Sequence, residues 1–163
     1  MDKDSERETR PWAYSTSLAM IALMALMLSL MASAYAAELT YGPYRAMVVK
    51  VLDGDTVQLE VGLWPGLTQR INLRLVGVNT PEKRGPKVSN CEKKAGQDAT
   101  TFTQRWLQGV KEVTISEVRH DKYAGRALGK LRRLDGKDLA EALITSGHAR
   151  PYDGGKRGSW CLD

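Results

Sequence analysis

The chain has 163 residues, of which 42% are hydrophobic and 26% are charged, and its formal net charge is +5. This composition excludes a wholly disordered chain and a collagen-like repeat, and the length suits one domain with a tail. Two cysteines are too few for a disulfide-rich scaffold or a four-thiolate zinc site. The positive charge indicates a polyanionic partner and says nothing about the fold.

Residues 1–36 have the layout of a secretory signal peptide: charged residues, a dense apolar run over residues 18–31, and small residues before a cleavage point. Cleavage fits either after Ala34 or after Ala36. Acidic residues outnumber basic ones at the start of the chain, which is unusual for a signal peptide. The alternative is an uncleaved membrane anchor over residues 18–37, whose length is close to what spanning a bilayer requires. We expect cleavage, which predicts an exported domain, periplasmic or secreted, over residues 37–163.

Both cysteines, Cys91 and Cys161, lie in this predicted domain. An oxidising compartment permits a disulfide between them, and two free thiols are the alternative. Because Cys161 is third from the end, a bridge would tether an otherwise loose tail. We therefore favour the disulfide.

Next along the chain come signals for short strands, which are rich in β-branched residues or alternate apolar with polar residues. Turn residues separate the first strands, with Asp53-Gly54-Asp55 before the second strand and a further turn over residues 63–68 around Pro65-Gly66. The five predicted strands cover residues 44–51, 56–61, 70–74, 113–118 and 127–134.

Two segments have helical periodicity instead. The first begins with a capping pattern at Ser89 and Glu92 and ends near Gly109. The second begins at Asp138 and ends at Gly147. Five short strands with two to three helices predict an α+β fold, a five-stranded Greek-key β-barrel of the OB type.

Three clusters of polar residues lie at the ends of predicted strands: Asp53 to Thr56, Arg74 to Glu82, and His120 to Arg126. Paired aspartates on a turn can supply oxygen ligands to a hard cation such as calcium. Each cluster also has an ordinary structural explanation, namely a turn, a strand cap and a solvated hairpin tip.

Taken in order, the motifs VLDGDTV (51–57), LRLVGVNTPE (73–82) and DKYAGRAL (121–128) are more specific than any one of them, and EALITSGHA (141–149) supports them. Over about residues 48–151 the chain resembles the staphylococcal-type thermonuclease family of calcium-dependent phosphodiesterases. The resemblance implies a nuclease that cleaves DNA, and RNA as well, with little sequence preference, leaving a 3′-phosphate.

The resemblance also implies a calcium site. Asp55 matches the aspartate that binds calcium directly, and Asp53 matches an acidic residue of the outer shell. Asn79 lies where the family usually has a second calcium-binding aspartate, and Thr80 matches a ligand through its backbone oxygen. An amide in place of a carboxylate removes one negative charge, so we expect weaker calcium binding.

The catalytic roles carry over in the same way. Glu82 matches the glutamate proposed to activate the attacking water, and Arg74 and Arg126 match the arginines that hold the scissile phosphate. Lys122 and Tyr123 align with residues that contact a substrate phosphate. Ala124 makes the turn before Arg126 one residue longer than the commonest family form, which we expect to shift the guanidinium.

These residues lead to one main prediction, an exported calcium-dependent nuclease that acts as a monomer without an obligate protein partner. The alternatives are a binding module of the same fold with little turnover, and a membrane-anchored form of the enzyme. Pure binding needs no general base, so the presence of Glu82 with both arginines favours the enzyme.

Overall fold

The computed structural model describes residues 19–27, 39–123 and 125–161, and it divides the chain into one unit up to Leu39 and a second from Thr40. In the first unit residues 19–27 form a helix, whose methionines Met20 and Met24 are more than 70% exposed. No helix among the described residues is long and apolar enough to cross a membrane. Both expected cleavage points lie outside the described residues, so cleavage stays a prediction.

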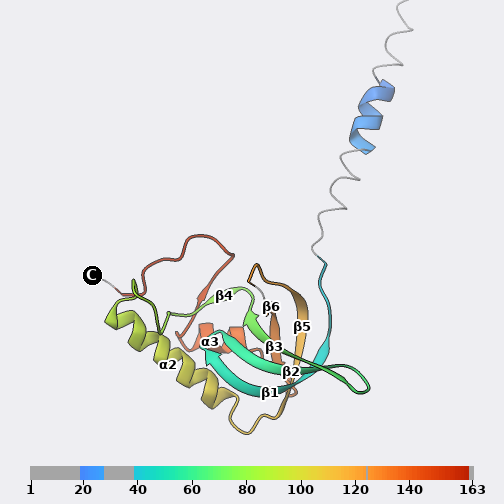
Figure 1. Cartoon of the computed structure of the whole chain (residues 1–163). Helices are drawn as coiled ribbons and strands as arrows, with labels where there is room; N and C mark the ends of the chain where they lie inside the picture. The colour runs from blue at the N-terminus through green and yellow to red at the C-terminus, as the bar shows by residue number, and fades with distance from the viewer. Residues whose placement is uncertain (1–18, 28–38, 124, 162–163) are drawn as a thin grey trace, which may run out of the picture. The chain divides into compact units, whose positions relative to one another are not determined.

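Five strands of the second unit close into a barrel in the order β1-β2-β3-β6-β5 (Figure 1). Neighbouring strands are antiparallel except β3 and β6, which run parallel. The five-stranded barrel predicted from the sequence is therefore confirmed. Its strands are β1 (Tyr44–Asp53), β2 (Thr56–Trp64), β3 (Leu67–Leu75), β5 (Glu112–His120) and β6 (Arg126–Arg133).

The strand ends differ from the prediction between β2 and β3. Residues 63–68 were expected to form a turn, but only Pro65 and Gly66 separate the two strands, and Gly66 has a φ of +82°. Trp64 is 74% exposed, so backbone pairing rather than burial holds this part of the hairpin. Two further strands, β4 (Val78–Asn79) and β7 (Arg150–Pro151), pair with each other and were not predicted.

Alternate residues of the strands fill the barrel, as the period of two requires. Leu59, Leu73, Ile115 and Leu131 come from four different strands, and each is at most 1% exposed. Burial of one such side chain contributes about 1.5–3 kcal/mol. The core therefore fixes which face of β2 and β3 turns outward, and the polar residues of those strands lie on that outer face.

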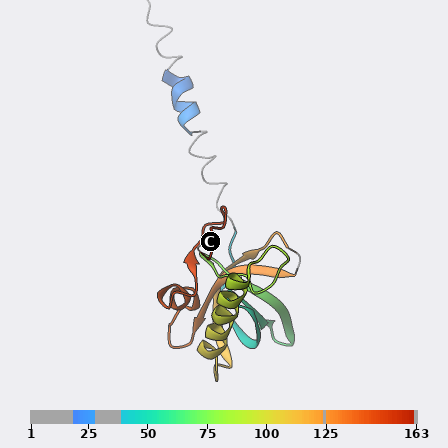
Figure 2. The same cartoon turned by 90° about the vertical axis from the view of Figure 1, so that its left-hand side faces the viewer.

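Helix α2 (Asn90–Trp106) packs against β1, and Figure 2 shows it lying across the barrel. Ser89 caps it as predicted, because its hydroxyl accepts the backbone N–H of Glu92 at 3.2 Å. The helix ends at Trp106 rather than at Gly109, and the chain turns over residues 107–109. Helix α3 (Leu139–Thr145) begins at its predicted cap, Asp138.

Cys91 and Cys161 form a disulfide with their Cα atoms 6.3 Å apart, which confirms the predicted pairing. Cys91 lies in the first turn of α2. Cys161 accordingly lies beside the start of this helix, and Figure 1 shows the C-terminal segment approaching that end of α2.

Candidate active site

The carboxylate of Asp55 lies at the centre of a buried polar cluster and is only 2% exposed. The register of β2 and β3 places Thr56 opposite Arg74 and so brings the guanidinium to this carboxylate. Arg74 Nη1 donates to Asp55 Oδ1 at 2.6 Å, and the Thr56 hydroxyl donates to the same oxygen at 3.0 Å. Loss of one partner of such a buried ion pair costs about 3–5 kcal/mol, because the other charge stays buried and unpaired.

Asn79 and Thr80 join this cluster from the segment that follows β3. Gly77 turns the chain with a φ of +77°, and both following polar residues are buried. Arg74 Nη2 donates to Asn79 Oδ1 at 3.3 Å, and the Thr80 backbone N–H donates to Asp55 Oδ2 at 3.2 Å. The structure thus brings together four of the predicted site residues in one hydrogen-bonded group.

The donors of this group are the type that calcium prefers, since carboxylate, amide and carbonyl oxygens are hard ligands. Asp55 and Asn79 accept from the two terminal nitrogens of the Arg74 guanidinium, so one cation already binds both side chains. The group contains a single carboxylate, and among the described residues no three His, Cys, Asp or Glu side chains are arranged to hold a metal. The oxygen atoms of these residues are of the kind that binds calcium. They would form a site of low negative charge, in which Arg74 competes with the cation for Asp55.

Asp53 faces α2 from the same turn. Its Oδ1 accepts the Gly54 N–H at 3.0 Å and the Thr100 hydroxyl at 3.3 Å, while Thr103 donates to the Gly54 carbonyl at 2.6 Å. A Cβ on Gly54 would lie 2.9 Å from that of Ala99, closer than real side chains approach. The turn is therefore held tightly on α2, and an outer-shell role for Asp53 stays a prediction.

Glu82 lies on a segment that is fixed to α2 and to β1. Its backbone N–H donates to Glu92 Oε1 at 3.2 Å, and Lys83 Nζ donates to the Leu52 carbonyl. A Cβ on Gly96 would lie 2.6–2.7 Å from backbone atoms of residues 81–83, so only glycine permits this approach. The Glu82 carboxylate, whose side chain is 37% exposed, forms an ion pair with Arg157.

Arg126 begins β6 and forms an ion pair with Asp121 of the preceding turn. Burial raises the pKa of the Asp121 carboxyl, but the Arg126 guanidinium and the backbone N–H groups of Lys122 and Tyr123 outweigh it, so the net pKa is lowered. Arg126 also lies over the Tyr123 ring, 4.6 Å from its centroid, and Lys122 approaches the same ring at 5.3 Å. Ala124 lies outside the described residues.

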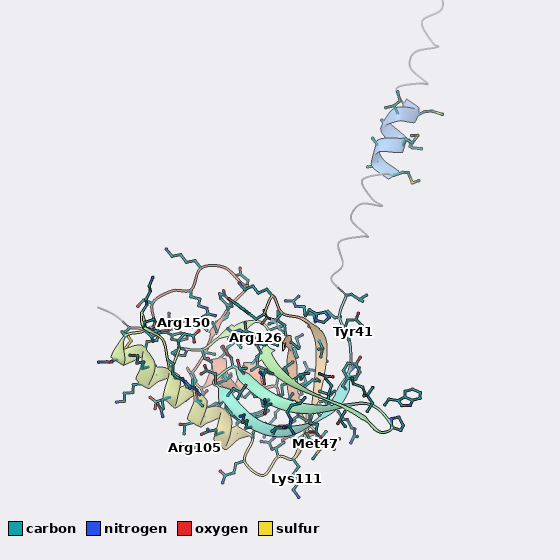
Figure 3. The ribbon with its side chains drawn as sticks, viewed as in Figure 1. Tyr41, Met47, Arg105, Lys111, Arg126 and Arg150 are labelled. Carbon is teal, nitrogen blue, oxygen red and sulfur yellow. A yellow bond between two sulfur atoms is a disulfide. The ribbon has the colours of Figure 1, made fainter. Side chains whose placement is uncertain are left out.

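The parallel register of β3 and β6 brings the two predicted phosphate-binding arginines to one face. Arg126 lies opposite Asn72, and Leu128 lies opposite Arg74. Residues two apart share a face, so Arg74 and Arg126 are offset by one strand and two residues, which places their Cα atoms about 8 Å apart. The side chains of Arg74 and Arg126 are long enough to reach one anion between them. In Figure 3 Arg126 is labelled on the side of the barrel opposite Arg105 and Lys111.

An open groove of about 470 Å³ is lined by residues of β3, β5 and β6, with Arg126 among them. Aromatic and basic side chains line it together, among them Tyr41, Tyr44, Arg70 and His120. Flat aromatic surfaces beside positive charge suit the bases and phosphates of a nucleic-acid strand.

A family model described as staphylococcal nuclease homologue matches residues 72–158, which is more than half of the chain. The chain belongs to this family. The matched segment contains Arg74, Asn79, Glu82 and Arg126, whereas Asp55 precedes it.

Similar proteins include two from Escherichia coli O157:H7 and Escherichia coli, each named an uncharacterized endonuclease and 29% identical over 106 residues. The match covers 65% of this chain and 60% of each relative. The protein named MJ1439, from Methanocaldococcus jannaschii, is 32% identical over 135 residues, covering 69% of this chain and 61% of the relative. This staphylococcal nuclease homologue thus spans about 60% of the length of the curated relatives it matches.

The structure adds residues to the site of this nuclease homologue to which the sequence analysis gave no role in the site. Arg157 contacts Glu82 from 75 residues further along the chain, and Glu92 and Gly96 fix the backbone behind it. Asp121 is the partner of Arg126. Of these, only Asp121 had a visible signal, an acidic residue five positions before a predicted catalytic arginine.

Proposed function

We propose that this staphylococcal nuclease homologue is an exported, calcium-dependent nuclease that hydrolyses phosphodiester bonds of DNA and RNA with little sequence preference. The observation that carries the proposal is the buried group of Asp55, Arg74, Asn79 and Thr80, joined by hydrogen bonds. Family membership and relatives named endonucleases support the reaction class.

The chemistry follows from the charge of the substrate. A phosphodiester is an anion and repels an attacking hydroxide unless its charge is neutralised. Arg74 and Arg126 supply two guanidinium groups, each able to bind two phosphate oxygens, and they act most strongly where charge grows in the transition state. When bound by Asp55, Asn79 and Thr80, with Asp53 in the outer shell, calcium would add further positive charge beside the phosphate.

In this proposal Glu82 removes the proton from the attacking water. Its side chain is partly exposed and its backbone is fixed on α2, so that it combines access to water with a defined position. Lys122 and Tyr123 are assigned to a neighbouring phosphate of the strand. The turn that contains Lys122 and Tyr123 also contains Asp121, the ion-pair partner of Arg126. One turn therefore holds both the contact with the scissile phosphate and the contact with its neighbour.

The test is cleavage of single-stranded DNA by the purified chain, with calcium and with a chelator. Glu82→Gln keeps the shape of the side chain and removes the base, and it should lower kcat about 10²–10⁴-fold. Glu112→Gln is the matched control, because Glu112 forms an ion pair with Arg45 away from the site residues and should leave kcat unchanged. Equal rates for the wild type and Glu82→Gln would refute the role of Glu82.

One observation favours the second candidate function, a binding module of the same fold. Asp55 is already paired with Arg74, and Asn79 contributes no charge, so the site must release a guanidinium contact to take a cation. DNA that binds without being cut, even at millimolar calcium, would identify the binding module.

Export is part of the proposal and rests on the pattern of residues 1–36 together with the disulfide between Cys91 and Cys161. The mass of the mature N-terminus tests it. A start at Tyr35 or Ala37 supports the secreted or periplasmic form, whereas a retained N-terminus supports the tether over residues 18–37.

A further inference from the structure

The C-terminal segment, residues 152–161, is held at both ends beside the candidate site. At its start, β7 pairs with β4 so that Arg150 lies opposite Asn79, and the Tyr152 N–H donates to the Gly77 carbonyl at 2.9 Å. At its end, Cys161 is bonded to Cys91 in the first turn of α2. A segment of this length fixed at both ends has little freedom to move away from the residues between them.

Contacts within the segment define its path further. Arg150 Nη1 donates to the Ser159 carbonyl at 2.9 Å, and its guanidinium lies 4.2 Å from the centre of the Trp160 ring. The Tyr152 hydroxyl donates to the Gly155 carbonyl at 2.8 Å. These bonds hold the loop between the two ends in a defined shape and place Arg157 over Glu82.

Arg157 Nη1 donates to Glu82 Oε1. Burial lowers the pKa of the Arg157 guanidinium, but the charge of Glu82 and hydrogen bonds with Tyr152 and Glu82 outweigh it, and the net pKa is raised. A free glutamate side chain rotates about three bonds, so one bond to Oε1 removes much of that freedom. The segment around Glu82 is fixed through its backbone, and Arg157 is the contact that fixes its carboxylate.

We propose that Arg157 is a positioning residue for the Glu82 carboxylate, and that the disulfide between Cys91 and Cys161 is the clamp that keeps Arg157 there. This inference rests on the proposed nuclease function, because it assigns to Arg157 the orientation of the general base of that reaction. In this assignment Arg157 holds Oε1, and the second carboxylate oxygen accepts the proton of the attacking water.

The experiment measures kcat and KM of the oxidised full chain on a single-stranded DNA oligonucleotide with calcium. Arg157→Gln should lower kcat about 10- to 100-fold, as expected for a misplaced catalytic group, and leave KM within about threefold. Arg157→Lys should restore part of kcat. Lys156→Gln is the matched control, since it removes the neighbouring positive charge of the same segment, and it should behave as the wild type.

A second readout separates positioning from general damage to the fold. In a chain that already carries Glu82→Gln there is no base to position, so adding Arg157→Gln should change the residual rate less than about twofold. An equal loss in both backgrounds would overturn the proposal. An unchanged kcat of the Arg157→Gln variant would also overturn it. A rise in KM alone would make Arg157 a substrate contact, and a rise in kcat would make it inhibitory, and either result would overturn the proposal as well.

The clamp is tested by Cys161→Ser and by a thiol reductant acting on the wild type. Both should lower kcat to about the level of Arg157→Gln, and the double variant of Cys161→Ser with Arg157→Gln should be no worse than either single one. Full kcat without the disulfide would overturn the clamp. Circular dichroism of each variant shows whether the barrel is retained. The Arg157→Gln variant keeps the disulfide, so it tests the positioning of Glu82 independently of the clamp.

Failure of the inference differs from failure of the proposed function. A wild type that cuts DNA, an impaired Glu82→Gln and an unimpaired Arg157→Gln would refute only the inference. A wild type that does not cut, or a Glu82→Gln variant as fast as the wild type, would refute the proposed function and this inference with it.

Discussion

Gly96 gives the sharpest test of how α2 supports the candidate site. A Cβ at this position would lie 2.6 Å from Lys83 N and Pro81 O and 2.7 Å from Glu82 C. Ordinary van der Waals contact begins at 3.4 Å, so Gly96→Ala must move the segment at residues 81–83 away from the helix by about 0.8 Å. The atoms it meets belong to the backbone, and rotation of a side chain cannot relieve the contact.

Two opposing effects set the change in stability. Alanine is favoured over glycine within a helix by about 1 kcal/mol, whereas overpacking costs about 1–3 kcal/mol. The free energy of unfolding should therefore fall by no more than about 2 kcal/mol. Activity should suffer more, because a shift of nearly 1 Å in a catalytic group can lower the rate about 100-fold.

The assay compares kcat for DNA cleavage and the free energy of unfolding in urea for Gly96→Ala and for Gly62→Ala. Gly62 has no atom within 4 Å of the position that a Cβ would take, so the control adds the same methyl group in open space. It should change stability by less than about 0.5 kcal/mol and leave kcat unchanged. A Gly96→Ala variant that is folded and fully active would refute the argument that this close approach positions Glu82.

Three further predictions concern charge and covalent links. Asn79→Asp adds a carboxylate beside Arg74 and should tighten calcium binding about tenfold, measured by isothermal titration calorimetry; unchanged affinity would exclude Asn79 as a ligand. The lowered pKa of Asp121 means that its carboxylate stabilises the fold at neutral pH, and that this contribution is lost as the pH falls below the ordinary value of 3.8 and through the folded pKa. The stability difference between the wild type and Asp121→Asn, followed by thermal unfolding, should therefore shrink in acid, and a constant difference would contradict the ion pair. Removal of the Cys91–Cys161 bridge, which spans 70 residues, should cost at most about 4 kcal/mol in urea unfolding, and a loss below about 1 kcal/mol would mean that it tethers only the tail.

Burial decided which parts of the fold were predictable from the sequence. The barrel strands were found because alternate residues such as Leu59 and Leu73 are buried, and alternation records burial. The ends of β2 and β3 were missed because Trp64 and Leu67 are exposed although their backbones are paired with each other. The pair β4 and β7 left no signal, since a strand of two residues has no period.

The residues of the candidate site also divide into those that the sequence predicted and those that it did not. Asp55, Arg74, Asn79 and Thr80 were predicted from two motifs that the structure joins by hydrogen bonds. The contact of Arg157 with Glu82 depends on the path of the C-terminal segment, which no local spacing encodes. The role of Gly96 depends on a distance between two backbones, and a glycine within a helical pattern does not reveal it.

The unequal bonds of Arg74 suggest why an asparagine in this cluster is compatible with phosphate binding. Its Nη1 is held at 2.6 Å by a carboxylate, whereas its Nη2 is held at 3.3 Å by the neutral amide of Asn79. Hydrogen bonds between two ions are shorter and stronger than those to neutral acceptors, so a phosphate can displace Asn79 from Nη2 more readily than Asp55 from Nη1. An aspartate at this position would compete with the phosphate for Nη2, and a carboxylate would then hold each of the two nitrogens. Under the proposed function Asn79 would weaken calcium binding and leave one side of the Arg74 guanidinium to the phosphate, so the Asn79→Asp variant should bind calcium more tightly while raising KM for DNA.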